Sequence, residues 1–477
     1  MARVFIRDSA GLAASQYVAR AILLARGVAA AAALGPAGFG AWNALNLILD
    51  YGAYASLGAI QGLDLVLPAA AARGETESAR RAMRGGWWIT LAGALAFAAG
   101  VVFVLANGQW VASSGWGWGA PALMLLAAIL QLAILYHAAT LRAHGDFSNT
   151  SAGLALQALV GGGIGIFAVW RFGVWGLLLG WNAGSLAAIA WMRRSRSRPP
   201  LLPAGPREGM ALAARGFPIF AFFTLTLVIR SLDRIALARW GDPRALGLYS
   251  LGLTAVALVL YLPEAAAAVL FPRIAAAAEG ARDADETRRQ VVQVHRVLMV
   301  ALPTLVGPGV LFAPWVLSWA LPTFAASIEP LRVLAVAALV VSMATLPSYY
   351  LLGSSRSPAT LWVPALAALV AAVAIFTTAM RAPGATPVAW AATLGYACFA
   401  LAMLALATPR LATEPRDRVA LLIGSLIPVI WASALTLWLS RTPDATLMGA
   451  ILKSLAFLGL HAPVALVFGG VVRMRGK

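Results

Sequence analysis

Residues 360–380 have the sequence TLWVPALAALVAAVAIFTTAM, which contains no charged side chain. A stretch of roughly 20 apolar residues crosses a hydrocarbon core about 30 Å thick when it forms an α-helix. Apolar stretches of similar length run almost end to end through the chain. Only 11% of the 477 residues are charged, and the mean hydropathy is +0.82, whereas about 25% of residues in soluble domains are charged. The sequence therefore predicts an all-α, polytopic membrane protein.

We expect about 14 transmembrane helices, because each apolar stretch is long enough for one crossing. They are predicted at residues 11–33, 41–68, 87–106, 119–141, 150–170, 173–192, 213–239, 246–271, 296–319, 328–352, 360–380, 386–407, 419–439 and 446–472.

The placement of the basic residues predicts how the helices are oriented. A net charge of +18 could suggest a nucleic-acid partner, but the arginines are concentrated in every second loop. With the N-terminus inside, roughly 25 basic residues lie on the cytoplasmic side and about 5 outside, which is the asymmetry that sets orientation. The outer loop 107–119 has no charge and contains Trp110, Trp116 and Trp118, as in an interfacial aromatic belt. We expect both termini in the cytoplasm, membrane lipids around the helices and no nucleic acid as partner.

The chain also resembles itself at a shift of about 207 residues, as in transporters built from parallel repeats. Leu34–Trp42 recurs loosely as Gly241–Tyr249, and Leu67–Ala71 recurs as Phe271–Ala275. This repeat predicts a six-helix lobe at 1–195, a cytoplasmic linker at 196–212, a second six-helix lobe at 213–410 and an extra helix pair at 411–477. A pseudo-two-fold axis along the membrane normal would relate the two lobes.

Five short motifs carry a resemblance to a known family. They are GPAGFG at 35–40, SLGAIQ at 56–61, LDRI at 232–235, LGLYS at 246–250 and PLRVL at 330–334. With this order and spacing, the chain resembles the Wzx-type O-antigen flippases, which are the polysaccharide transporters of the multidrug/oligosaccharidyl-lipid/polysaccharide (MOP) exporter superfamily. The resemblance covers nearly the whole sequence.

The resemblance implies a MATE-like architecture, with two six-helix lobes around a central cavity that opens alternately to either side. It implies a polyprenyl-pyrophosphate-linked oligosaccharide as substrate, moved to the outer leaflet of the bacterial inner membrane, and possible contact with polysaccharide polymerase machinery. The extra helix pair is similar to that of the lipid II flippases, where such a pair lines a lipid-facing groove.

Four arginines within the predicted spans are candidate substrate ligands: Arg20, Arg26, Arg230 and Arg234. Charges at bilayer depth are costly, so they tend to face a cavity or a partner. The resemblance implies that the first and seventh helices face each other, and planar guanidinium groups suit the oxygens of a pyrophosphate. Alternatively, Arg20 snorkels toward the cytoplasmic interface, and Arg26 forms a structural ion pair with Asp50.

Four acids within the spans are candidates for ion coupling or for structural pairing: Asp50, Asp64, Asp233 and Glu264. Carboxylates at membrane depth can bind a proton or Na⁺ and so couple transport to an ion gradient. The structural alternative pairs Asp233 with Arg230, three residues away on one helix face. Asp64 and Glu264 could instead lie near the cytoplasmic surface and neutralise arginines there.

We expect neither a cofactor nor a metal. The only cysteine is Cys398, the four histidines are isolated, and no Walker motif is present. Gly161–Gly165 lacks the Lys and Ser/Thr of a phosphate-binding loop and predicts close helix packing or bending instead.

The transporter hypothesis has several rivals. Within the same superfamily these are an ion-coupled multidrug exporter and a lipid II-type flippase. A drug exporter for cations would need a cavity dominated by carboxylates, whereas arginines outnumber acids at the predicted site. A membrane enzyme would need a hydrophilic loop with acids or a metal site, and the longest outer loop has none, so we expect no enzyme. A purely structural scaffold would leave the costly intramembrane charges without a role.

Overall fold

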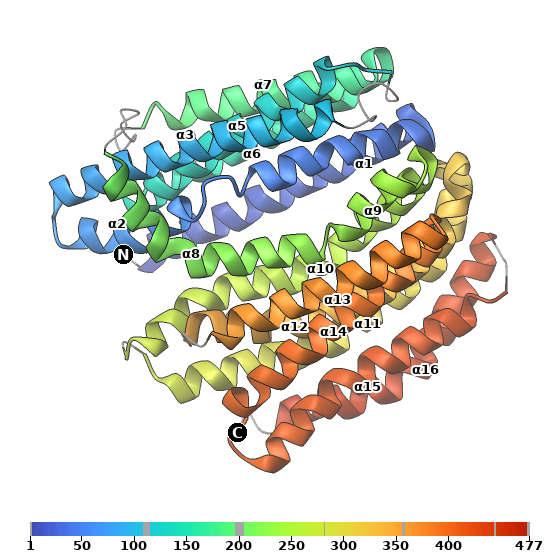
Figure 1. Cartoon of the computed structure of the whole chain (residues 1–477). Helices are drawn as coiled ribbons and strands as arrows, with labels where there is room; N and C mark the ends of the chain where they lie inside the picture. Colours follow the sequence, from blue (N-terminus) through green and yellow to red (C-terminus); the bar gives the residue numbers. More distant parts are fainter. Residues whose placement is uncertain are drawn as a thin grey trace. The chain divides into compact units, whose positions relative to one another are not determined.

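A computed structural model describes residues 2–107, 115–195, 205–280, 282–354, 358–442 and 445–474. Every regular element within these ranges is a helix, so the predicted all-α class is confirmed (Figure 1). The chain divides into two compact units, Met1–Leu227 and Val228–Lys477. Each unit is described by itself below.

The first unit contains seven helices among the described residues. They are α1 (Ala2–Gly52), α2 (Ala59–Ala72), α3 (Thr76–Ala106), α5 (Gly119–Ala143), α6 (Phe147–Phe172), α7 (Val174–Met192) and most of α8 (Pro206–Ile229). Its core includes a cluster in which Leu63 of α2, Tyr136 of α5 and Leu212 of α8 are buried together. The Tyr136 hydroxyl donates a hydrogen bond to the carbonyl of Met83 at 2.9 Å, which satisfies the one polar atom of that side chain.

The regular elements described in the second unit are also all helices. Its described elements are α9 (Leu232–Trp240), α10 (Pro243–Ala278), α11 (Ala284–Ala320), the short 3₁₀ helix η1 (Pro322–Ser327), α12 (Ile328–Ser354), α13 (Ala359–Arg381), α14 (Ala385–Leu411), α15 (Pro415–Leu439) and α16 (Leu447–Met474). α12 and α14 are the most enclosed candidate spans, and α12 packs against both α10 and α14.

Thirteen described helices are long and apolar enough to cross a membrane. The first of these runs through both arms of α1, which meet at Gly35, where φ is 64° and ψ is 177°. Glycine tolerates this positive φ at little cost, and Pro36 starts the second arm without needing an N–H partner. The described residues thus contain thirteen such helices, where the sequence predicted about 14.

Large apolar side chains cover much of the surface, which a membrane protein requires. Phe167, Trp319, Trp362 and Leu466 each expose more than 70% of their area. Exposed apolar surface of this extent belongs in lipid rather than in water. The chain is therefore a multi-pass membrane protein.

Two predicted helices are broken in the structure, and the prediction of continuous spans there was wrong. The span expected at 41–68 is interrupted by a turn at 53–58, where Leu57 and Gly58 have φ values of 50° and 92°. The span expected at 213–239 is divided at 230–231, between α8 and α9. Hydropathy does not reveal the first break, because residues 53–58 are largely apolar, and at the second it shows only that Arg230 and Ser231 are polar, which does not by itself end a helix.

The two units also part at a different place from the predicted linker at 196–212. The boundary lies after Leu227, inside α8. Most of α8 belongs to the first unit because its glycines allow close packing there. A Cβ atom added to Gly216 would lie 2.1 Å from the carbonyl oxygen of Gly58, and one added to Gly209 would lie 2.7 Å from that of Gly85.

Candidate functional site: charged side chains within the helices

Arg26 is the best-defined intramembrane charge of the first unit. Its guanidinium stacks over the indole ring of Trp181, 4.2 Å from the centroid. Stacking of a guanidinium on tryptophan is favourable, the more so away from water. The Nη1 atom of Arg26 and the Nε1 atom of Trp181 are both buried without a hydrogen-bond partner among the described residues. The stacked pair therefore offers two unused N–H donors.

The glycine run 161–165 explains how Arg26 reaches this position. A Cβ atom at Gly165 would lie 3.1 Å from the Arg26 Cδ atom, and one at Gly162 would lie 2.2 Å from Ile22 of α1. On the other side, Gly161 of α6 packs against the backbone of Gly180 on α7. Small residues at helix interfaces let backbones approach closely. The run is thus a three-helix packing site, as the sequence predicted.

The other predicted site residues of α1 lie apart from this pair. Arg20 is exposed, and Asp50 is half-buried near the end of the second arm. The described contacts of Arg26 are with Trp181 and Gly165, so the suggested Arg26–Asp50 ion pair is not among them. Twenty-four residues and the kink at Gly35 separate the two positions along α1.

In the second unit, Arg230 forms an ion pair with Glu264 of α10, with Nη1 and Oε1 2.7 Å apart. The suggested pairing of Arg230 with Asp233 is therefore replaced by a pairing between helices. Arg230 lies in the break between α8 and α9, whereas Asp233 lies in the first turn of α9. The break removes the continuous helix on which the spacing argument rested.

Asp233 is fully buried and has two tyrosines as partners. The Tyr249 hydroxyl donates to its Oδ2 atom at 2.5 Å, and the Tyr396 hydroxyl donates to the same atom at 3.1 Å. The backbone N–H of Arg234 donates to Oδ1 at 2.6 Å. Donors of this kind stabilise a carboxylate away from water. Arg234, itself half-buried, follows directly and so carries its positive charge beside this cluster.

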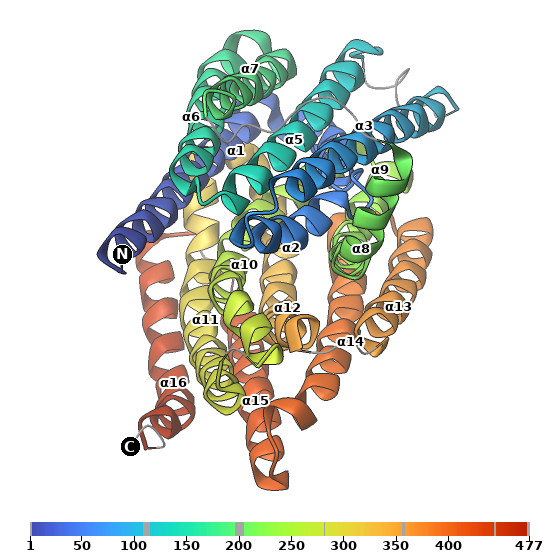
Figure 2. The ribbon, with the colours of Figure 1, turned by 90° about the vertical axis from the view of Figure 1, so that its left-hand side faces the viewer.

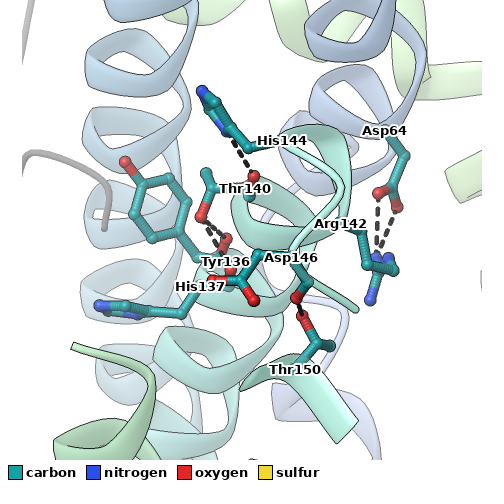
Figure 3. Close-up of polar contacts among 8 residues, drawn as sticks. All are labelled: Asp64, Tyr136, His137, Thr140, Arg142, His144, Asp146 and Thr150. Atoms are coloured by element: carbon teal, nitrogen blue, oxygen red, sulfur yellow. Dashed lines mark hydrogen bonds and ion pairs between the residues drawn. The ribbon is translucent and has the colours of Figure 1, made fainter. Parts of the chain in front are cut away.

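Asp64 forms an ion pair with Arg142 near the end of α5 (Figure 3). The Arg142 Nη2 and Asp64 Oδ1 atoms are 2.9 Å apart. The Arg142 side chain is 37% exposed and the Asp64 side chain 43%. Asp64 therefore neutralises an arginine, which is the structural alternative that the sequence left open. A pair this exposed contributes little to stability.

Figure 3 also shows Asp146, the N-cap residue of α6. It follows Arg142 of this ion pair closely in the sequence. Its carboxylate accepts hydrogen bonds from the Asn149 backbone N–H and the Ser195 hydroxyl. Burial raises the pKa of Asp146, but the hydrogen bonds from Ser195 and Asn149 outweigh it and hold the pKa below its usual range. Asp146 thereby joins the start of α6 to the turn that follows α7.

The sequence did not single out Trp181, Tyr249 or Tyr396 as part of either charged cluster. Tyr249 lies in the LGLYS motif, but that motif does not reveal which acid the hydroxyl reaches. Among the residues that the structure describes, no group of three His, Cys, Asp or Glu side chains could hold a metal ion.

Comparison with known proteins assigns the chain to a family. Residues 72–321, more than half of the chain, match the family model described as "Polysaccharide biosynthesis protein". The chain belongs to this family. No curated protein sequence matches it.

Solved structures show the fold of this polysaccharide biosynthesis protein. It is similar to the lipid II flippase MurJ in an inward closed conformation, with a TM-score of 0.71 and 12% identity over 96% of this chain and 98% of MurJ. It is also similar to an inward-facing multidrug resistance MATE family transporter of the MOP superfamily. That match has a TM-score of 0.67 and 15% identity over 82% of this chain and 94% of the transporter. The chain thus combines membership of the polysaccharide biosynthesis family with the fold of MurJ and the MATE transporters, so the family and the MATE-like fold that the sequence resemblance implied are confirmed.

Proposed function

We propose that this protein is a flippase that moves a polyprenyl-pyrophosphate-linked oligosaccharide from the cytoplasmic to the outer leaflet by alternating access. The observation that carries the proposal is the match to the polysaccharide biosynthesis family in a chain with a flippase-like fold. The product would supply surface polysaccharide synthesis, with polymerase machinery as a downstream partner. The bacterial inner membrane is the proposed location, with both termini in the cytoplasm.

The arginines support an anionic head group as the part of the substrate that is recognised. Arg26 and Trp181 present two buried N–H donors without acceptors. Unused buried donors cost free energy, which an incoming oxygen anion would recover. The proposal assigns Arg20 and Arg26 of the first unit, and Arg230 and Arg234 of the second, to the pyrophosphate. In this assignment the ion pair with Glu264 holds Arg230 in position between substrates.

The extra helix pair α15–α16 favours a lipid-linked substrate over a soluble drug. Similar MATE transporter structures match 82 to 87% of this chain, whereas MurJ matches 96%. The difference is about the length of the extra pair, Pro415–Met474. A lipid II-type substrate is the second candidate, because the fold is shared along nearly the whole chain with a lipid II flippase.

The coupling ion belongs to the same proposal. Asp64 and Glu264 are engaged in ion pairs, which supports a structural role for both. We propose Asp233, which is fully buried, as a candidate for binding a proton or Na⁺, with Asp50 of α1 as a second. Of these, Asp233 is the more enclosed, and protonation or ion binding there would change its contacts with Tyr249 and Tyr396.

The experiment uses a strain that lacks this protein. It measures in which leaflet the lipid-linked oligosaccharide of that strain accumulates. We expect the unpolymerised intermediate to accumulate in the inner leaflet and the wild-type chain to restore surface polysaccharide. Arg26→Ala should reduce export at least about 10-fold, because it removes a charge-assisted contact worth about 1.5–3 kcal/mol. Arg26→Lys should recover part of the loss, because it keeps the charge but not the planar fork.

Arg73→Ala is the matched control, since Arg73 pairs with Glu75 in an exposed loop outside the spans. It should export normally. Normal polysaccharide in the deletion strain, together with altered sensitivity to cationic drugs, would reject the flippase and assign the protein to the drug exporters. Accumulation of lipid II instead would favour the second candidate.

A further inference from the structure

Helix α16 contacts the rest of its unit through one narrow stripe. Figures 1 and 2 show it at the edge of the second unit, beside α15 and α11 respectively. Its buried side chains recur every three to four residues and so share one helix face. They are Ala450, Ser454, Phe457 and His461. Phe457 packs with Leu311 of α11 and Ala432 of α15. The stripe therefore lies in the seam between these two helices.

Two of the four side chains in this stripe are polar and lack hydrogen-bond partners among the described residues. Both ring nitrogens of His461 and the hydroxyl of Ser454 are buried without a hydrogen bond to any described residue. Helical serines commonly bond the carbonyl four residues back, as Ser425 and Ser440 do on α15. Ser454 leaves that option unused.

A second histidine continues this row of polar groups toward the expected cytoplasmic side. The Ser425 hydroxyl donates to the carbonyl of Leu421 at 2.7 Å and lies 2.8 Å from the Nε2 atom of His295 on α11. Because that hydroxyl proton is already used, Nε2 is the donor and carries the ring proton. The Nδ1 atom of neutral His295 is then a bare lone pair, and it is buried without a partner.

Prolines free further backbone carbonyls from helical hydrogen bonds along α11. α11 contains Pro303, Pro308 and Pro314, none of which has an N–H to donate. Each therefore leaves the carbonyl four residues earlier without its helical hydrogen bond. Inside a membrane, such freed carbonyls are tolerated where other helices, side chains or ordered water satisfy them. The seam thus concentrates buried donors and acceptors that the described side chains do not pair.

Charged residues on the two helices packed against α16 lie only at their expected cytoplasmic ends. On α11 they are Asp285, Glu286, Arg288, Arg289 and Arg296, and on α15 they are Arg416, Asp417 and Arg418. On α16 itself, the Lys453 ammonium donates to the carbonyl of Thr442. His461 lies 14 residues into α16, about 21 Å along its axis. His461 is therefore the titratable side chain of the seam at membrane depth. The other histidine of the seam, His295, lies closer to the expected cytoplasmic side.

We propose that the seam between α11, α15 and α16 is hydrated and conducts protons, with His461 as the proton-accepting side chain at mid-membrane. Each unpaired polar group would cost a few kcal/mol in a dry seam, and internal water satisfies such groups with two to four hydrogen bonds. A hydronium ion gives its proton to the ring-nitrogen lone pair and becomes water. The imidazolium then releases its other N–H proton to the next water, which becomes hydronium. Protons would thus drive transport through the extra helix pair, a role that rests on the proposed flippase function.

Cysteine labelling tests the hydration without reference to transport. In a Cys398→Ala background, Ser454→Cys is exposed to a small, charged methanethiosulfonate in membrane vesicles. Thiols react as thiolates, which form in water and not in a dry apolar core. We expect it to react at least about 10-fold faster than Ala371→Cys, a matched control that is buried on α13 against α14, away from the seam. Equal, slow labelling at both positions would overturn the proposal.

A second measurement tests the proton itself. His461→Gln keeps the volume and hydrogen bonding of the side chain but cannot be protonated, so it should fold and lose the dependence of export on the proton gradient. His144→Gln, at the end of α5, should retain that dependence. Wild-type dependence in His461→Gln would reject the proton path. Absence of any export by the wild-type chain would reject the flippase instead, while the labelling result would still stand or fall separately.

Discussion

Single side chains determine which intramembrane charges are available to a ligand. Arg230 is already paired with Glu264. Arg26 instead stacks on the Trp181 ring, and its Nη1 atom has no hydrogen-bond partner among the described residues. Asp233 shows the opposite case, a carboxylate surrounded by donors. Burying a charge without partners costs far more than burying one that is hydrogen-bonded. The two tyrosines are therefore what allows Asp233 to be fully buried.

Removing one of these donors should be measurable. Tyr249→Phe is expected to lower the free energy of unfolding by about 1.5–3 kcal/mol, because hydrogen bonds to charged groups contribute that much. Tyr396→Phe should cost less, since its hydroxyl is farther from the Asp233 Oδ2 atom, at 3.1 Å instead of 2.5 Å. Thermal unfolding of the detergent-solubilised protein would check both. A larger loss for Tyr396→Phe would contradict this ranking.

Close helix packing in the first unit depends on glycine at positions where α2, α3 and α8 meet. The turn at 53–58 ends at Gly58, whose positive φ of 92° suits glycine. Beyond it, a Cβ atom at Gly62 would lie 2.2 Å from the carbonyl oxygen of Leu212. This interface attaches α8 to the first unit, although the internal repeat assigned that helix to the second lobe.

Gly62→Ala should disrupt the α2–α8 interface. A methyl group there overlaps backbone atoms, which cannot move aside as a flexible side chain does, and overpacking costs about 1–3 kcal/mol. Gly163→Ala is the matched control, because nothing lies within 4 Å of its added Cβ atom. The control should be neutral or slightly stabilising, since alanine favours helix. Thermal unfolding that ranks the two variants in the reverse order would show that the interface is loose.

At the scale of the whole molecule, the alternation of basic loops predicts orientation. We expect a reporter that is active only in the cytoplasm to function when fused to either terminus or inserted in the predicted linker at 196–212. The same reporter should be inactive when inserted in the uncharged outer loop at 107–119. An active reporter in that loop would invert the topology and, with it, the direction of the proposed transport.

The family and the general architecture could be predicted from the sequence because hydropathy, loop charge and short motifs are local properties. An ionisable residue in an apolar stretch can be identified from the sequence for the same reason. This applies to Arg20, Arg26, Arg230, Arg234 and the four acids. Their convergence on one substrate stays a prediction. The orientation of both termini also stays a prediction.

Tertiary structure alone decided the partners. Which acid meets Arg230, which hydroxyls reach Asp233 and which ring lies under Arg26 depend on helices that are distant in sequence. The breaks at 53–58 and 230–231 and the buried stripe of α16 are likewise decided by packing. In a membrane nearly every helix residue is apolar, so hydropathy marks where the chain crosses the bilayer. It does not distinguish the face that meets another helix from the face that meets lipid, because association there depends on close fit and polar contacts.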